Sequence, residues 1–125
     1  MARRRSLVAA ALLGLAAGPG CGKQVASGRA DGAAIFSEVC ARCHGPVGVP
    51  DAANVARLGV KPLDSPHVQS ELSDEDIRRQ ILHGSRNKQM PAFAGALSDD
   101  QVEAIVSHVR TLGAGARGAA ATERR

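Results

Sequence analysis

The sequence predicts a small all-α domain, and three segments support that prediction. Residues 73–83 and 98–112 each open with a serine, and Asp76 and Gln101 stand three residues further on, which completes the pattern of an N-terminal capping box. A third helix is expected to start after Asp31, a favourable N-cap residue. Because apolar residues follow each cap at helical spacing, we expect each helix to bury one face.

The two later helices have marked apolar faces and ends. The helix after Ser73 is expected to turn Arg78 and Arg79 to solvent and to stop at Gly84. The helix after Ser98 is expected to stop at Gly113. Their inward residues are predicted to be Ile77, Ile81 and Leu82 in the first, and Val102, Ile105, Val106, Val109 and Leu112 in the second.

Composition divides the chain into four parts. Residues 1–20 combine three arginines with an apolar run too short to span a membrane, which indicates a removable signal peptide. Cys21 follows at a position suited to lipid attachment in a bacterial lipoprotein, with cleavage nearby or a free thiol as alternatives. Residues 21–30 and 113–125 predict a flexible tether and a disordered tail. The folded domain is therefore expected within residues 31–112.

Charge and aromatic content give no support to nucleic-acid binding. The whole chain has 16 Lys and Arg against 12 Asp and Glu, but residues 31–112 hold 8 basic and 11 acidic residues, a balance of −3. With no Trp or Tyr and two Phe, stacking on bases has few partners. The same composition deprives a short domain of large core side chains, so we expect another apolar group at its centre.

Residues 40–44 read CARCH and carry the strongest chemical signal. A thioredoxin-like pair belongs beside a strand and helix, a zinc site needs four ligands, and a local disulfide leaves His44 unexplained. Covalent haem attachment uses all three residues, because Cys40 and Cys43 can each bond a vinyl group while His44 ligates iron. Residues three apart share a helix face, so both sulfurs should point the same way. The sequence therefore favours haem.

A haem iron needs a second axial ligand, and Met90 is the candidate. Pro91 stiffens the segment around it, while Gly84 and Gly95 free the chain on either side. A neutral thioether would raise the reduction potential relative to a second histidine. The alternative is a core residue. The histidines expected outside the iron site are His67, His83 and His108.

The segments GAAIFSEVCARCHG, LSDEDIRRQILHG and QMPAFAGALSDDQVEAIVSHVRTL resemble, in this order, the three parts of a small class I cytochrome c. The resemblance covers residues 31–112 and implies an all-helical fold wrapped around one covalently attached haem. It implies Cys40 and Cys43 as thioether sites, with His44 as the proximal and Met90 as the distal ligand.

The resemblance also implies supporting roles. Gly32 and Phe36 correspond to positions where the first helix of the family crosses the last. The last helix of the family usually offers an aromatic residue, and this chain has His108, so a thinner contact is expected, with His108 near the surface. The resemblance implies that the backbone carbonyl of Pro62 orients the proximal imidazole, with Pro46 and Pro50 as competing candidates.

The function implied is one-electron transfer between redox partner proteins, without catalysis. A haem sensor or haem enzyme with a labile sixth ligand is the alternative. Because haem is attached to reduced thiols after export, we expect a bacterial periplasmic protein, a monomer that docks transiently, tethered to the membrane where Cys21 is lipidated. Cations expected near Met90, which would favour an acidic partner, are Arg78, Arg79, Arg86 and Lys88.

Overall fold

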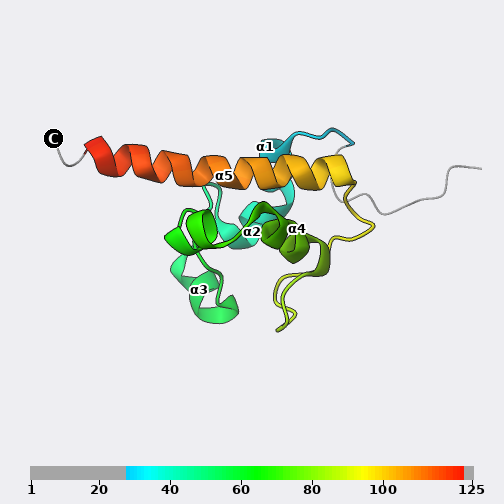
Figure 1. Ribbon diagram of the computed structural model, residues 1–125. Coiled ribbons are helices and arrows are strands. Elements are labelled where there is room, and N and C mark those ends of the chain that lie inside the picture. Colours follow the sequence, from blue (N-terminus) through cyan, green and yellow to red (C-terminus); the bar gives the residue numbers. More distant parts are fainter. Residues whose placement is uncertain (1–27, 123–125) are drawn as a thin grey trace, which may run out of the picture.

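The computed structural model describes residues 28–122, and every regular element within them is helical (Figure 1). The elements are, in chain order, α1 (Gly32–Ile35), η1 (Phe36–Cys40), α2 (Ala41–His44), α3 (Ala52–Leu58), η2 (His67–Glu71), α4 (Asp74–His83) and α5 (Asp99–Thr122). The long helix α5 lies along one side of the domain and contacts α1 and α4. This confirms the all-α class. The predicted signal peptide, Cys21 and most of the predicted tether lie outside the described residues.

The first helix is continuous but changes type. Asp31 caps it as predicted, because its carboxylate accepts a hydrogen bond from the Ala34 N–H at 3.1 Å. Over η1 the helix widens into a π turn, in which the Ala41 N–H bonds to the Phe36 carbonyl. A π turn takes up more residues than an α turn, so side chains on its two sides do not keep simple α spacing. The segment upstream of the turn packs on α5, and the segment downstream lines a cavity.

The crossing of α1 and α5 is close. A side chain on Gly32 would collide with the Ala104 backbone of α5, so only glycine fits there. One turn along, the Phe36 and His108 rings pack with centroids 5.1 Å apart and planes tilted by 56°. His108 is half-buried rather than at the surface, because its ring takes the place of the expected aromatic partner.

Both predicted capping boxes form. In α4 the Ser73 hydroxyl accepts from the Asp76 N–H at 3.1 Å, and the Asp76 carboxylate accepts from the Ser73 N–H at 2.9 Å. In α5 the Gln101 N–H donates to Ser98 at 3.3 Å, and the Ser98 N–H donates to Gln101 at 3.0 Å. The apolar faces that follow meet in one core of Ile35, Val68, Ile77, Ile81, Leu97, Val102, Ile105, Val106 and Val109.

Two predictions about the helices are wrong. The helix α5 does not stop at Gly113 but continues to Thr122. Glycine ends a helix when its backbone is left-handed, which Gly113 is not, and the alanine-rich residues beyond it favour helix. Arg78 does not turn to solvent, since it is 26% exposed and forms an ion pair with Glu103 of α5.

Two elements, α3 and η2, are not among the predicted helices. A local signal existed for α3, because Asp51 accepts from the Asn54 N–H at 2.7 Å and Gly59, with φ of 65°, ends the helix. The π turn η2 has no such cap and follows Pro66 directly.

Within residues 28–122, no helix is both long and apolar enough to cross a membrane.

Candidate functional site

A cavity of about 720 Å³ brings together four of the five residues singled out in the sequence. Cys40, Cys43 and His44 line one part of its wall, and Met90 lines another. Pro62 is absent from the lining, although both of its neighbours contribute to it. The apolar part of the lining comprises Phe36, Val39, Leu58, Val60, Leu63, Val68, Leu72, Ile77, Ile81, Phe93, Ile105 and Val109.

The two cysteines reach the cavity from η1 and α2. Both are half-buried free thiols, and burial, followed by the charge of Cys43, raises the pKa of the Cys40 thiol to about 11. At neutral pH, with no metal bound, the Cys40 thiol is therefore protonated. Among residues 28–122, no group of three or more His, Cys, Asp or Glu side chains gathers in a way that would hold a metal ion.

His44 ends α2, and a glycine makes the turn that follows. The Gly45 N–H bonds to the Ala41 carbonyl at 2.8 Å, and its φ of 77° and the nearby Val49 carbonyl leave no room for a side chain. Burial lowers the pKa of His44, so its imidazole is neutral at neutral pH. A neutral imidazole has one nitrogen with a free lone pair, which is the form that ligates iron.

The Nδ1 atom of His44 is buried and has no hydrogen-bond partner among the described residues. The expected partner, the Pro62 carbonyl, accepts instead from the Ser65 N–H at 3.3 Å. The hydrogen bond from His44 to Pro62 is therefore not formed in this structure. An orphaned polar atom in an apolar wall indicates that this imidazole is positioned for something other than packing.

Met90 lies on a strap, residues 85–94, that closes on itself after α4. Figure 1 shows this strap extending from the end of α4. The Met90 N–H donates to the Ser85 hydroxyl at 2.9 Å, and the Met90 carbonyl accepts from the Ser85 N–H at 3.1 Å. The strap then docks on the end of α4, where the Phe93 N–H bonds to the Ile81 carbonyl at 3.1 Å. These bonds use backbone groups that a helix end leaves free, so they fix the strap without a further element.

The sulfur of Met90 has one polar neighbour that the sequence did not reveal. The Gln80 amide nitrogen lies 3.8 Å from the Met90 Sδ atom, within range of a weak hydrogen bond to sulfur. Gln80 is ten residues away in sequence, and nothing in the helical pattern of α4 distinguishes it from an ordinary exposed position.

The wall opposite the strap is held by two residues, Arg110 and Gln69, that no sequence pattern singles out. Arg110 of α5 donates to the Val68 carbonyl at 2.8 Å and to the Leu72 carbonyl at 2.7 Å, and also to Asp74. The amide of Gln69 donates to the Leu63 carbonyl at 2.6 Å and to the Val109 carbonyl at 3.0 Å. Together they tie residues 63–72 to α5 as one side of the cavity.

These residues fit a covalently bound haem. The cavity is largely apolar, two thiols three residues apart share its wall, and a neutral imidazole with an unpartnered Nδ1 lies beside them. The thioether of Met90 lies on another part of the same cavity wall. An all-helical fold around such a cavity, with C-x-x-C-H at the end of the first helix, defines the class of c-type cytochrome domains.

Comparison with known proteins identifies the family. The family model described as "Cytochrome C oxidase, cbb3-type, subunit III" matches residues 28–109. A solved structure described as "KustC0563 c-type cytochrome" is 32% identical, with a TM-score of 0.60, and the match covers 66% of this chain and 96% of that one. The chain belongs to this family of c-type cytochrome domains, which carry haem c bound through the two cysteines, here Cys40 and Cys43.

The chain is also similar to proteins of different sizes. Cytochrome c6 of Parathermosynechococcus lividus is 38% identical over 80 residues, which span 64% of this chain and 85% of that protein. "Dihydro-heme d1 dehydrogenase" of Pseudomonas aeruginosa is 35% identical over 99 residues, but the chain spans only 18% of its length. "Cbb3-type cytochrome c oxidase subunit FixPc" of Rhizobium leguminosarum is 32% identical, and the chain spans 28% of it.

Proposed function

We propose that this domain is a one-electron carrier whose single haem c has His44 and Met90 as axial ligands. The observation that carries the proposal is the meeting of a neutral imidazole and a thioether on the wall of the cavity that holds both thiols. With both axial positions taken by the protein, the iron has no place for a substrate. Electron transfer is the chemistry that such a centre supports.

The role of the protein is to keep the surroundings of the haem iron the same in both oxidation states. The haem supplies the electron-accepting iron, and the chain fixes its surroundings. Cys40 and Cys43 prevent dissociation, the apolar wall excludes water, and the strap that bears Met90 is closed on itself and docked on α4. Small rearrangement between oxidation states favours rapid transfer, so a rigid strap serves this function.

The neighbours of Met90 favour a carrier over an enzyme. The polar side chains that line the cavity near it are amides and a hydroxyl, namely Gln80, Ser85, Asn87 and Gln89. None of these is a general acid or base at neutral pH, and haem-dependent peroxide chemistry needs such a group on the distal side. The dehydrogenase relative does not alter this argument, because the matched region is a small part of that protein.

Partners and location follow as parts of the same proposal. The Rhizobium relative is described as an oxidase subunit, which supports a redox protein as the partner of this domain. Covalent haem attachment supports export to the periplasm.

We further propose a monomer that docks transiently, and a lipid on Cys21 as a membrane tether. Mass spectrometry of the protein as exported tests the tether, which an unmodified N-terminus beyond Cys21 rules out.

The proposed ligation is tested by absorption spectra of the purified holoprotein, oxidised and reduced, with and without carbon monoxide. We expect reduced c-type bands, a weak far-red band in the ferric state, and no response to carbon monoxide. Met90→Leu, which preserves volume, should lose the far-red band and bind carbon monoxide, while the control Gln89→Leu should not. Carbon monoxide binding by the unaltered protein would favour a sensor or enzyme with a labile sixth ligand.

A further inference from the structure

The strap has two arms, and they are held in different ways. The later arm, residues 91–94, docks on the end of α4, where the Phe93 N–H donates to the Ile81 carbonyl at 3.1 Å. The earlier arm, residues 85–89, makes no main-chain hydrogen bond to another element within the described part of the chain. Met90 lies where the two arms meet, so its position depends on how the earlier arm is held.

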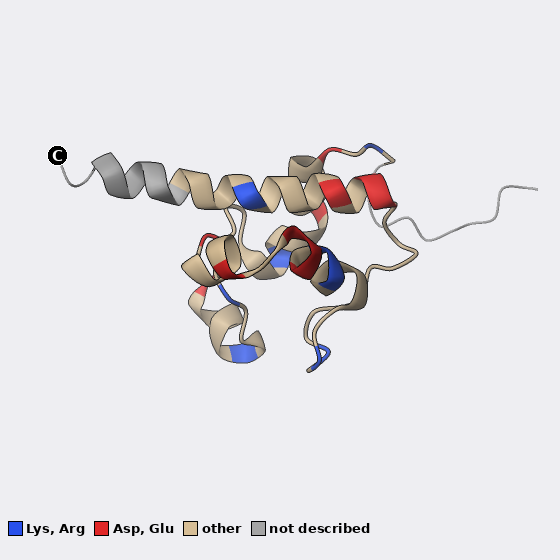
Figure 2. Cartoon of the chain, in the orientation of Figure 1, with Lys and Arg blue, Asp and Glu red and all other residues tan. Residues whose placement is uncertain are grey.

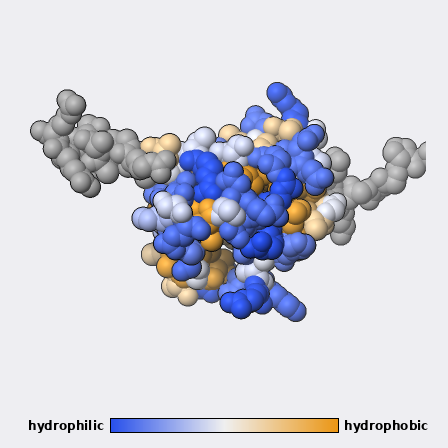
Figure 3. All heavy atoms as spheres, viewed as in Figure 1, coloured by the Kyte–Doolittle hydropathy of each residue, from blue (hydrophilic) through white to orange (hydrophobic). Residues whose placement is uncertain are grey.

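The earlier arm is not held by burial or by ion pairs. Residues 86–89 are exposed. Figure 2 shows the strap extending away from α5, with the blue of its Lys and Arg residues at the tip, and the space-filling view of Figure 3 shows a hydrophilic tip. Arg86 and Lys88 form no ion pair with any residue in the range 28–122. The earlier arm therefore depends on hydrogen bonds formed within the strap.

Ser85 takes part in most of these bonds. Its hydroxyl accepts from the Met90 N–H at 2.9 Å, and its own N–H donates to the Met90 carbonyl at 3.1 Å. Its carbonyl accepts from the Lys88 N–H at 2.9 Å, at the tip of the arm, where Lys88 has a left-handed φ of 59°. The N–H, the carbonyl and the hydroxyl of Ser85 thus all bond within the strap, and two of the three bond to Met90.

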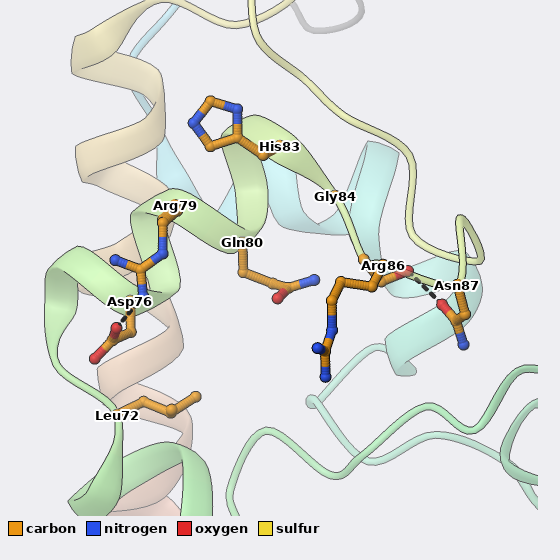
Figure 4. Close-up of a pocket in the computed structure, with 9 residues that line it drawn as sticks. Leu72, Asp76, Arg79, Gln80, His83, Gly84, Arg86 and Asn87 are labelled. Atoms are coloured by element: carbon orange, nitrogen blue, oxygen red, sulfur yellow. Dashed lines mark hydrogen bonds and ion pairs between the residues drawn. The ribbon is translucent and has the colours of Figure 1, made fainter.

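The Ser85 hydroxyl is oriented by Asn87. A hydroxyl has one proton to donate, and here it goes to the Asn87 Oδ1 atom at 2.6 Å, so its lone pairs are left for the Met90 N–H. The dashed line at Asn87 in Figure 4 marks this bond. The same Oδ1 atom accepts from the Gln89 N–H at 3.2 Å, which holds the Asn87 side chain in this position. Gly84 lets the strap close, because its φ of 72° and the nearby Met90 carbonyl leave no room for a side chain.

The geometry points to Ser85 as the positioning residue of the distal ligand: its hydroxyl closes the strap on Met90 and so keeps the sixth position of the iron closed to outside ligands. This inference rests on the ligation of the iron by Met90 in the proposed function. An outside ligand can bind only when Met90 has withdrawn. The bond between the Met90 N–H and the hydroxyl opposes that movement, while the later arm stays docked on α4. Loss of the hydroxyl should therefore leave Met90 as the ligand but let it withdraw more often.

The test is the binding of imidazole to the ferric holoprotein, followed in the absorption spectrum at about pH 8, where imidazole is uncharged. The apparent affinity is the intrinsic affinity multiplied by the fraction of molecules in which Met90 has withdrawn. Ser85→Ala should raise this affinity about fivefold to tenfold, which corresponds to one neutral hydrogen bond. Ser85→Thr keeps the hydroxyl and should bind imidazole as the unaltered protein does. The control Arg86→Gln alters the next residue, whose side chain forms no hydrogen bond with any described residue, and should change nothing.

Two further measurements separate a local opening of the strap from a general loss of stability. In amide hydrogen exchange of the holoprotein, Ser85→Ala should speed exchange at the Met90 N–H and leave the Phe93 N–H, which bonds to α4, unchanged. Asn87→Ala tests the same bond from an exposed position that does not endanger the fold, and should give a smaller gain in imidazole affinity. Combined with Ser85→Ala it should add little, because Asn87 acts mainly through the hydroxyl.

Three outcomes would overturn the inference. An unchanged imidazole affinity in Ser85→Ala would show that the hydroxyl does not hold Met90 in place. An equal gain in Arg86→Gln or Ser85→Thr would show that any change in the earlier arm has this effect, and faster exchange at Phe93 as well as Met90 would show a general loss of stability.

The far-red band of the unaltered protein reports the axial ligation separately. Its absence would contradict the proposed function. Its presence, together with an unchanged affinity in Ser85→Ala, would contradict only the role of Ser85.

Discussion

The two sides of the cavity position their donors in different ways. On the side of His44, the donor and both thiols belong to one continuous helix, and Gly45 turns the chain away immediately after it. On the side of Met90, the donor sits on a strap without regular structure, held by its bonds to Ser85 and by the end of α4. The first side depends on helix formation and haem attachment. The second depends on a few identifiable hydrogen bonds, so its donor can be removed while the fold remains.

The largest expected effect comes from the His44 side. Cys40→Ala or His44→Ala should give a chain that fails to retain haem and is unstable, because the apolar cavity would then face water. Haem staining and limited proteolysis after export measure this. Met90→Leu is the matched comparison and should retain haem and resist protease. Recovery of a well-folded, haem-free Cys40→Ala domain would contradict the account.

The second largest effect is expected from a change in the wall of the cavity, and it concerns the stability of the fold. Arg110→Gln removes donors from the Val68 and Leu72 carbonyls and should lower the free energy of unfolding by about 2 kcal/mol, since hydrogen bonds to a charged group are the stronger ones. Urea unfolding of the holoprotein measures the loss. The control Arg57→Gln alters an exposed arginine that, among the residues the structure describes, bonds to Asn54 alone, so it should change little. Equal effects of the two variants would show that Arg110 does not hold the wall.

A smaller effect is expected from the Met90 side. Gln80→Leu removes the donor to the Met90 sulfur, which leaves the thioether a better electron donor to ferric iron, so the reduction potential should fall. Voltammetry of the holoprotein measures it, and the far-red band should remain. Gln89→Leu, on the strap itself, serves as the control. An unchanged potential would mean that the contact between Gln80 and Met90 has no electronic consequence.

The smallest effect concerns the start of α4, which supports the strap from a distance. The folded pKa of Asp76 is about 2, below its ordinary 3.8, so its stabilising contribution is complete above about pH 4 and is lost as pH falls towards 2. Asp76→Asn should therefore lower the melting temperature slightly at neutral pH, and the difference should close at low pH. A difference that stayed constant with pH would rule out this charge as its source.

The features that the sequence predicted are those with local causes. Ser73 with Asp76 and Ser98 with Gln101 act within four residues, and the C-x-x-C-H motif is contiguous, so each can be recognised without knowing the fold. The π turn at Phe36–Cys40 could not, because it accompanies the tight crossing of Gly32 on α5, a contact between distant segments. Arg110 and Gln80 were missed for the same reason, since their partners lie 38 and 10 residues away.

Two predictions were wrong because they assumed that glycine always ends a helix and that arginine always faces solvent. Gly113 was expected to end a helix, yet it lies within α5 and is buried against the side chain of Gln69, which a larger residue would have to push aside. Arg78 was expected to face solvent, yet it links α4 to α5 through Glu103. At both positions the conformation depends on a contact with another element of the fold. Local helix propensity does not describe such contacts.

The central claim is that Met90 completes the coordination of the iron opposite His44. Proton nuclear magnetic resonance of the reduced holoprotein tests it most directly, because the ring current of a haem shifts the methyl group of a ligating methionine far upfield. The account predicts one such three-proton resonance in the unaltered protein and its loss in Met90→Leu. A spectrum of the unaltered protein without that resonance would contradict the account.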